Sequence, residues 1–155
     1  MKVVGFSFNK ISIEREKEGD SITNKDIKIN THVEILDVVK TPMDLIKNSN
    51  LFNFKYQFKV IYTPNIASLN FEGSILINIS DDTLAKKIDK EWKDKTILEE
   101  VRIPLLNAIY SKCNLKAFQL EDDLNLPLHM PIPKLVSLSK DDLTNIKSTE
   151  GKNKK

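Results

Sequence analysis

The feature that most constrains the fold is the strict alternation of apolar and polar residues in the first half of the chain. Every even position from 52 to 62 is aromatic or valine, and the odd positions are polar except for Ile61. Successive side chains of a β-strand point to opposite faces, so this pattern predicts a strand with one buried and one solvent-facing side. Ranges 27–39 and 67–79 alternate similarly. Gly73 falls on the apolar side, which predicts close approach of a neighbour.

The N-terminal region predicts a fourth strand with an irregularity. Phe6 and Phe8 alternate in one phase, whereas Ile11 and Ile13 alternate in the other. One extra residue near positions 9–10 would restore the pattern, as in a β-bulge. The predicted third and fourth strands have no helix-length crossover between them, and this favours antiparallel pairing.

After residue 80 the pattern changes to that of a helix. Leu84, Ile88 and Trp92 recur every four residues, and either Ser80 or Asp81 could cap the start. These residues predict a first helix with one apolar stripe.

A second helix is predicted from Thr96 and Glu99, which have the spacing of a capping box. We expect Pro104 to kink this helix or to mark its true start, and Asn114 to end it. A helix on a single sheet needs one apolar stripe, so a second stripe predicts contact with another chain or with the C-terminal segment. The first stripe holds Leu98, Val101, Leu105, Ala108 and Ile109, and the second holds Ile103, Leu106 and Tyr110.

Together these patterns predict an α+β fold in which a four-stranded antiparallel sheet is followed by two or three helices packed on one face. The short third helix would begin within 139–142. The 155 residues suit a single domain, which we assign to residues 1–146. Residues 147–155 hold four lysines and one glutamate, a charge of +3, and are expected to form a disordered basic tail.

Charge and hydropathy limit the classes of function. The whole chain carries +2, so without the +3 tail the body is close to neutral at −1 and lacks the broad basic surface that phosphate binding requires. No apolar run approaches the roughly 18 residues of a membrane-spanning helix, and the N-terminus does not read as a signal peptide. We therefore expect a soluble, cytoplasmic protein with no membrane insertion.

Residues suited to catalysis are scarce. We expect His32 to be solvated on a strand face, and Cys113 to be a buried, inert thiol. His129 is expected to pack or cap, with ligation or catalysis as the alternative, and the acidic run 121–123 is interpreted as a solvated turn. The four glycines form no phosphate-binding cluster. We predict that the chain is not an enzyme and that it needs no metal or other cofactor.

A sheet-based RNA-binding module is the alternative function. Aromatics and lysines interleave between 52 and 59, and single-strand binders combine these residue types. On a strand, however, Tyr56 and Phe58 face away from Lys55 and Lys59, so the two kinds of side chain cannot flank one ligand. We therefore expect the aromatics to belong to the core, and nucleic acid to be an unlikely partner.

The segment 124–135 is unusually apolar for a region with three prolines, which exclude a regular helix. Such a segment either packs on the body or forms an exposed apolar lip. We predict that it binds apolar segments of other polypeptides, with closure of the protein's own core as the alternative. The predicted binding residues are Leu124, Leu126, Leu128, Met130, Ile132 and Leu135.

This order of elements resembles the SecB family of export chaperones. The similarity rests on Gly-Phe-Ser-Phe-Asn-Lys-Ile-Ser-Ile-Glu-Arg-Glu at 5–16, the long strands, Ile-Pro-Leu-Leu-Asn-Ala-Ile-Tyr-Ser-Lys-Cys at 103–113 and the Leu/Pro-rich stretch after it. The resemblance implies an ATP-independent holdase that binds unfolded or precursor polypeptides in apolar grooves near 17–26 and 124–135, and that assembles as a dimer of dimers. SecB proteins are typically acidic and engage the translocation machinery, whereas this body is near neutral, so that partner stays an open alternative.

Overall fold

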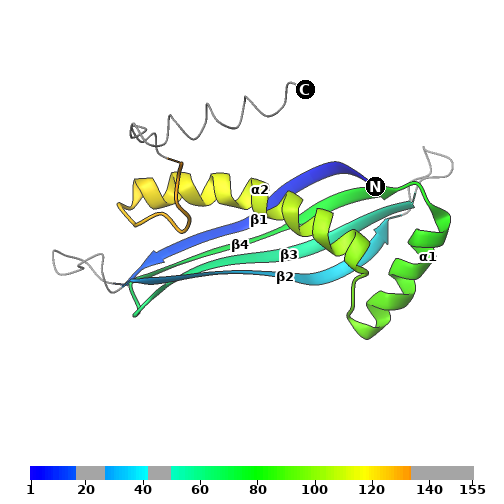
Figure 1. Cartoon of the computed structure of the whole chain (residues 1–155), viewed down its shortest axis with the longest axis horizontal. Helices are drawn as coiled ribbons and strands as arrows, with labels where there is room; N and C mark the ends of the chain where they lie inside the picture. The colour runs from blue at the N-terminus through cyan, green and yellow to red at the C-terminus, as the bar shows by residue number, and fades with distance from the viewer. Residues whose placement is uncertain (17–26, 42–49, 134–155) are drawn as a thin grey trace, which may run out of the picture.

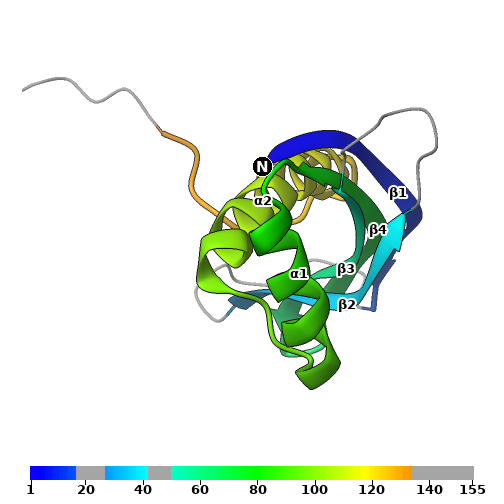
Figure 2. The ribbon, with the colours of Figure 1, turned by 90° about the vertical axis from the view of Figure 1, so that its right-hand side faces the viewer.

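The computed structural model describes residues 1–16, 27–41 and 50–133. Four antiparallel strands come first, followed by two helices on one side of the sheet, and the sheet curves around the longer helix (Figures 1 and 2). The predicted α+β fold with a four-stranded sheet is confirmed. The elements are β1 (Lys2–Arg15), β2 (Lys28–Thr41), β3 (Asn50–Thr63), β4 (Ala67–Ile79), α1 (Asp82–Glu91), the 3-10 turn η1 (Trp92–Asp94) and α2 (Glu99–Asp123).

The strand order is β1-β4-β3-β2, so the first two strands of the chain lie at opposite edges of the sheet. Every neighbouring pair is antiparallel. β3 and β4 are joined by a tight turn in which Asn65 has a φ of 44°, a left-handed conformation that asparagine tolerates better than most residues. The two central strands are therefore flanked on both sides, and they form the floor of the core.

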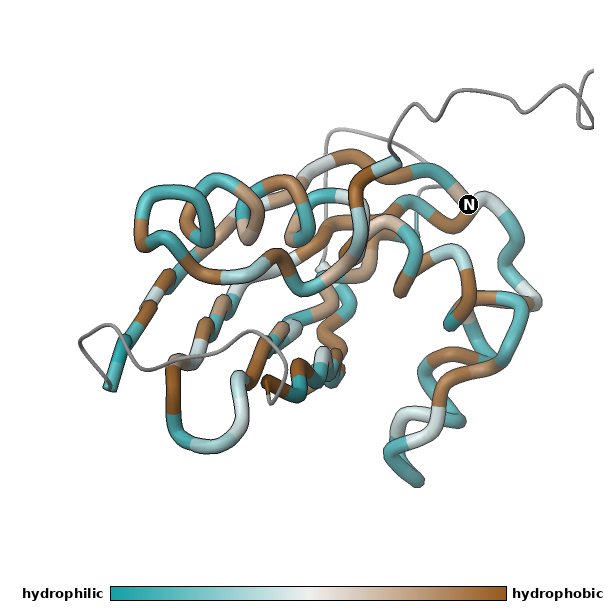
Figure 3. The backbone as a smooth tube through the Cα atoms, turned by 60° about the vertical axis from the view of Figure 1, so that its left-hand side comes forward, coloured by the Kyte–Doolittle hydropathy of each residue, from teal (hydrophilic) through white to brown (hydrophobic). Residues whose placement is uncertain are grey.

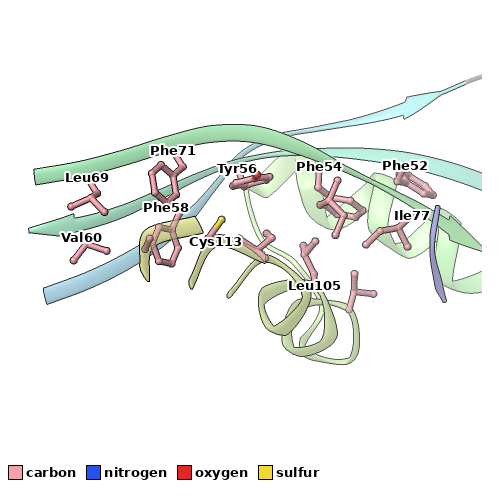
Figure 4. Packing of buried hydrophobic residues seen from close by; sticks show 14 of the residues in the cluster. Phe52, Phe54, Tyr56, Phe58, Val60, Leu69, Phe71, Ile77, Leu105 and Cys113 are labelled. Carbon is pink, nitrogen blue, oxygen red and sulfur yellow. The ribbon is translucent and has the colours of Figure 1, made fainter. Parts of the chain in front are cut away.

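The core lies between the central strands and α2, as the alternation predicts. The side chains of β3 that face the helix are all buried, from Phe52 to Tyr62, and so are their counterparts on β4. Leu105 and Cys113 of α2 cover them (Figure 4). The opposite face of the sheet carries mainly serine, asparagine, lysine and glutamate, and the alternation is visible along the strands in Figure 3.

The predicted bulge in the first strand is confirmed. Phe8 pairs with Gly73 and Lys10 pairs with Glu72, so the residue between them, Asn9, has no partner across the pair. Similar register shifts at Val4 in β1 and Leu36 in β2 were not predicted. Each bulge lies on an edge strand, where such irregularities interrupt the ladder and hinder unwanted strand pairing.

Gly73 is the point of closest approach within the sheet, as its position on the apolar face predicts. The Tyr56 hydroxyl crosses over this residue and donates a hydrogen bond of 3.2 Å to the backbone oxygen of Ser7. A Cβ at position 73 would meet both that oxygen and the Tyr56 hydroxyl. The absence of a side chain therefore makes room for the bond between β3 and β1.

The start of α1 is set by Asp81, the second of the two predicted caps. Its carboxylate accepts hydrogen bonds from the backbone N–H of Thr83 (2.8 Å) and Leu84 (3.2 Å). These bonds stabilise the ionised form and hold the pKa of Asp81 below its ordinary value. The cap satisfies two of the donors that every helix leaves unpaired at its first turn.

The predicted start of α2 is wrong. The hydroxyl of Thr96 donates backwards to Glu91, to its backbone oxygen at 3.1 Å and its carboxylate at 2.9 Å, and therefore does not form a capping box. Leu98 occupies the cap position without a side-chain bond. The helix begins at Glu99 and contains Pro104, so the proline does not mark its start.

The predicted end of α2 at Asn114 is also wrong, because the helix continues to Asp123. Ala117 and Glu121 prolong a series of buried positions four residues apart, so there is still core to cover beyond Asn114. The predicted third helix and the basic tail lie outside the described residues. No helix in the described part of the chain is long and apolar enough to span a membrane.

Candidate functional site

The apolar segment after α2 divides into a buried part and an exposed part. Leu126 is 7% exposed and belongs to the core, Leu124 packs against the core, and Leu128 is half-buried. Met130 and Ile132 expose 40% and 52% of their surface. Of the predicted binding residues, these two are the ones that offer substantial apolar surface to a partner, and Leu135 lies outside the described residues.

A buried carboxylate holds this segment against α2. Glu121 is fully buried, and its Oε1 accepts a hydrogen bond of 2.7 Å from the Tyr62 hydroxyl. Nδ1 of His129 lies 2.8 Å from the same oxygen, and the backbone N–H of His129 donates to Oε2 at 3.3 Å. Burial raises the pKa of Tyr62, and the adjacent Glu121 carboxylate raises it further, so the hydroxyl stays protonated as a donor.

The other side of the His129 ring completes the cluster. Nε2 of His129 lies 3.1 Å from Oδ1 of Asn114, whose amide nitrogen lies 3.3 Å from the sulfur of Met130. The rings of Phe58 and Phe118 flank the imidazole, with centroid distances of 6.3 and 5.0 Å. We call Tyr62, Asn114, Glu121 and His129 the Glu121 cluster.

The Glu121 cluster corrects one interpretation and confirms another. The reading of 121–123 as a solvated turn is wrong for Glu121, because this residue is the last buried position of α2. The expectation that His129 packs is confirmed, since both ring nitrogens contact protein atoms. The sequence does contain a signal for Glu121, which is its place in the series of buried residues Val101, Leu105, Ile109, Cys113 and Ala117.

A groove with a mixed apolar and charged lining lies beside the edge strand β2, and no sequence pattern predicted it. The groove, of about 440 Å³, opens between β2, the connection from α1 to α2, and the first turns of α2. Its residues come from three separate stretches of the chain, so no local pattern reveals it. We call it the β2 groove; it is lined by Val33, Glu34, Ile35, Trp92, Lys95, Thr96, Ile97, Arg102 and Leu106.

The β2 groove and the exposed end of the segment lie along the same side of α2. Leu106, Tyr110 and Asn114 are four residues apart and so follow one face of the helix. The Tyr110 ring packs edge-on against Phe58 at 5.9 Å, and Phe58 pairs with Val33 of β2. The groove at Leu106 is thus about 12 Å along the helix from Asn114, the neighbour of Met130, at 1.5 Å per residue.

The thiol of Cys113 and the aromatic side chains of β3 are buried. Burial raises the pKa of the Cys113 thiol to about 12, so this side chain is a neutral thiol in the native protein, as expected. No group of three histidine, cysteine, aspartate or glutamate side chains within 1–16, 27–41 and 50–133 could hold a metal ion. Phe54, Tyr56 and Phe58 are fully buried under α2, which confirms that the aromatics belong to the core.

Comparison with known proteins identifies the fold. No family model matches the chain, and no curated protein matches its sequence. Among solved structures, the chain is similar to the SecB-like chaperone Rv1957 of Mycobacterium tuberculosis, which was solved in complex with a ChAD peptide from the Rv1956 HigA1 antitoxin. The two share 11% sequence identity with a TM-score of 0.52, and the match covers 89% of this chain and 92% of the other.

Proposed function

We propose that this chain, which shares its fold with a SecB-like chaperone, is an ATP-independent holdase for non-native polypeptides. The observation that carries this proposal is the apolar surface along the β2 side of α2. It begins at the β2 groove and is followed, further along the helix, by Met130 beside Asn114, with the exposed Ile132 two residues later in the chain. That the similar chaperone was solved with a bound peptide supports the same class of ligand here.

The physical basis of binding is burial of apolar side chains from the client. Removing a leucine- or phenylalanine-sized side chain from water contributes roughly 1.5–3 kcal/mol. The groove volume is near the lower end of the range of about 300–1,000 Å³ typical of ligand pockets, so it suits one or two side chains and not a folded domain. Several such weak contacts along one extended client would add by multivalency, without any nucleotide.

The proposed client surface keeps the residues predicted from the sequence and adds the β2 groove. Met130 and Ile132 would contact the client directly, while Leu124, Leu126 and Leu128 anchor the segment to the core. Leu135 follows them in the chain and is proposed to extend the surface. We further propose that the protein acts in the cytoplasm as a dimer of dimers, on unfolded or precursor polypeptides, with export as one context.

Light scattering from thermally unfolding citrate synthase, recorded without ATP, tests this function. We expect the wild-type protein to suppress the aggregation, and the double variant Met130→Asp, Ile132→Asp to lose most of that protection. Ile61→Asp is the matched control, because Ile61 is 45% exposed on the sheet face away from the helices and does not line the groove. Circular dichroism would verify that each variant is folded.

The outcomes separate the parts of the proposal. A wild-type protein that leaves aggregation unchanged contradicts the holdase function itself. Full protection by the folded Met130/Ile132 variant would instead remove these two residues from the client surface.

A further inference from the structure

The mouth of the β2 groove carries more positive than negative charge. Lys95 and Arg102 line it together with one carboxylate, Glu34, which leaves a net charge of +1. Glu99 and Glu100 begin α2 nearby in sequence, but they are not part of the lining. The groove therefore offers one ligand both apolar side chains and positively charged side chains.

The two cations are not neutralised by ion pairs. In the described part of the chain, the salt bridges join Lys10 to Glu72, Lys40 to Asp89, Lys55 to Asp37 and His129 to Glu121. Neither Lys95 nor Arg102 takes part in any of them, although the charge of Lys95, after that of Lys55, helps to lower the pKa of the Asp37 carboxyl. A cation that forms no ion pair beside an apolar surface gains more from a ligand carboxylate than one that already forms one.

Lys95 is held in place by its local structure. The backbone at Lys95 has a φ of 56°, and its ammonium lies 4.4 Å from the centre of the Trp92 ring. Such a cation–π contact attracts the charge to the ring face but leaves the outer side of the ammonium available. Arg102 offers a planar group that can bind a carboxylate through two parallel hydrogen bonds.

We propose that the β2 groove selects extended polypeptide segments in which an apolar side chain lies close to an aspartate or glutamate. The apolar side chain occupies the floor formed by Val33, Ile35 and Leu106, and the carboxylate meets Lys95 and Arg102. The same charges disfavour the lysine-rich end of this chain, residues 147–155, as the occupant. This inference rests on the proposed function, because it names the client chemistry of the same surface.

Two synthetic peptides test this selectivity. They share an apolar centre of leucine and phenylalanine, flanked by glutamates in one and by lysines in the other. Fluorescence anisotropy with the full chain is expected to show about tenfold tighter binding of the glutamate peptide at low salt. The difference should shrink at high salt, because added ions screen the charges at the exposed rim.

Reversing one charge at the groove tests whether the preference for the glutamate peptide comes from the groove. Arg102→Glu changes an exposed side chain and is expected to reduce or reverse the preference. Lys112→Glu, which changes another exposed cation on α2 that does not line the groove, should leave the preference intact. Circular dichroism would again verify folding of both variants.

Each outcome has a distinct meaning. Equal binding of the two peptides overturns the selectivity while leaving the holdase function in place. A preference that survives Arg102→Glu in full places its origin outside the β2 groove and overturns the assignment. Failure of the wild-type protein to bind either peptide removes both this inference and the proposed function.

Discussion

At the scale of single residues, Gly73 is the position with the least room for change. A methyl group there would collide with the Ser7 carbonyl oxygen and with the Tyr56 hydroxyl that bonds to it. We expect Gly73→Ala to lower the free energy of unfolding by about 1–3 kcal/mol, the usual cost of overpacking, as measured by urea denaturation. Gly5→Ala is the control, since its Cβ would lie 3.7 Å from the Cβ of Leu76, an ordinary contact. Equal effects of the two substitutions would contradict this account.

The role of a residue could be predicted from the sequence where that role depends on residues nearby in the chain. The cap at Asp81 was one of two candidates because capping depends on the next three residues, and Gly73 stood out within its own strand. The four-residue spacing places Glu121 on the buried face of α2, but its role could not be assigned from its neighbours, since Glu-Asp-Asp reads as a solvated turn. Its partner Tyr62 lies 59 residues away in the chain, and only the packing of β3 against α2 brings them together.

At the scale of elements, the Glu121 cluster connects α2, β3 and the apolar segment. Replacing Glu121 by alanine removes the buried acceptor that Tyr62 and His129 share, although the Tyr62 hydroxyl keeps its 2.9 Å bond to the backbone oxygen of Pro127. We expect the free energy of unfolding to fall by about 1–3 kcal/mol, as for other buried polar groups that lose a hydrogen-bond partner, together with faster hydrogen exchange at the His129 amide. Glu100→Ala removes an exposed carboxylate from the same helix and should have little effect. Unchanged exchange at His129 would show that the cluster does not hold the segment.

The sequence predicted the first and last residues of the strands more accurately than those of the second helix. The alternation placed β4 at its observed bounds and β2 and β3 within two residues of theirs. The ends of α2 were wrong because the side chains that resemble boundary signals bond elsewhere. Thr96 donates back to Glu91, and Asn114 contacts Met130 beyond the helix. The β2 groove escaped prediction for a similar reason, since it exists only where three distant segments meet.

At the scale of the whole molecule, several apolar side chains remain exposed outside the client surface. Val3, Val4 and Ile11 lie on the edge strand β1, and Ile103 and Leu115 lie on α2. We expect light scattering after size-exclusion chromatography to give a multiple of the 17.8 kDa chain mass, because association would cover part of this surface. A monomer at micromolar concentration would contradict the proposed dimer of dimers.

A matched pair of variants locates the contact between copies. Ile103→Ser with Leu115→Ser should lower the measured mass if α2 takes part, whereas Asn107→Ser on the same helix should not. An unchanged mass for the Ile103→Ser, Leu115→Ser variant would indicate that copies of the chain meet through β1 and not through α2.

The side of the sheet that faces away from the helices limits how copies can meet. Residues such as Ser12, Lys59 and Ser74 would each lose water if a second sheet were laid over them. Exposed apolar side chains on this face, such as Val39 and Ile61, are outnumbered by these polar groups. Stacking of two sheets back to back, in the manner of a β-sandwich, is therefore unfavourable for this protein. Any assembly that it forms must grow through strand edges or helices, and it will keep its hydrophilic sheet faces on the outside.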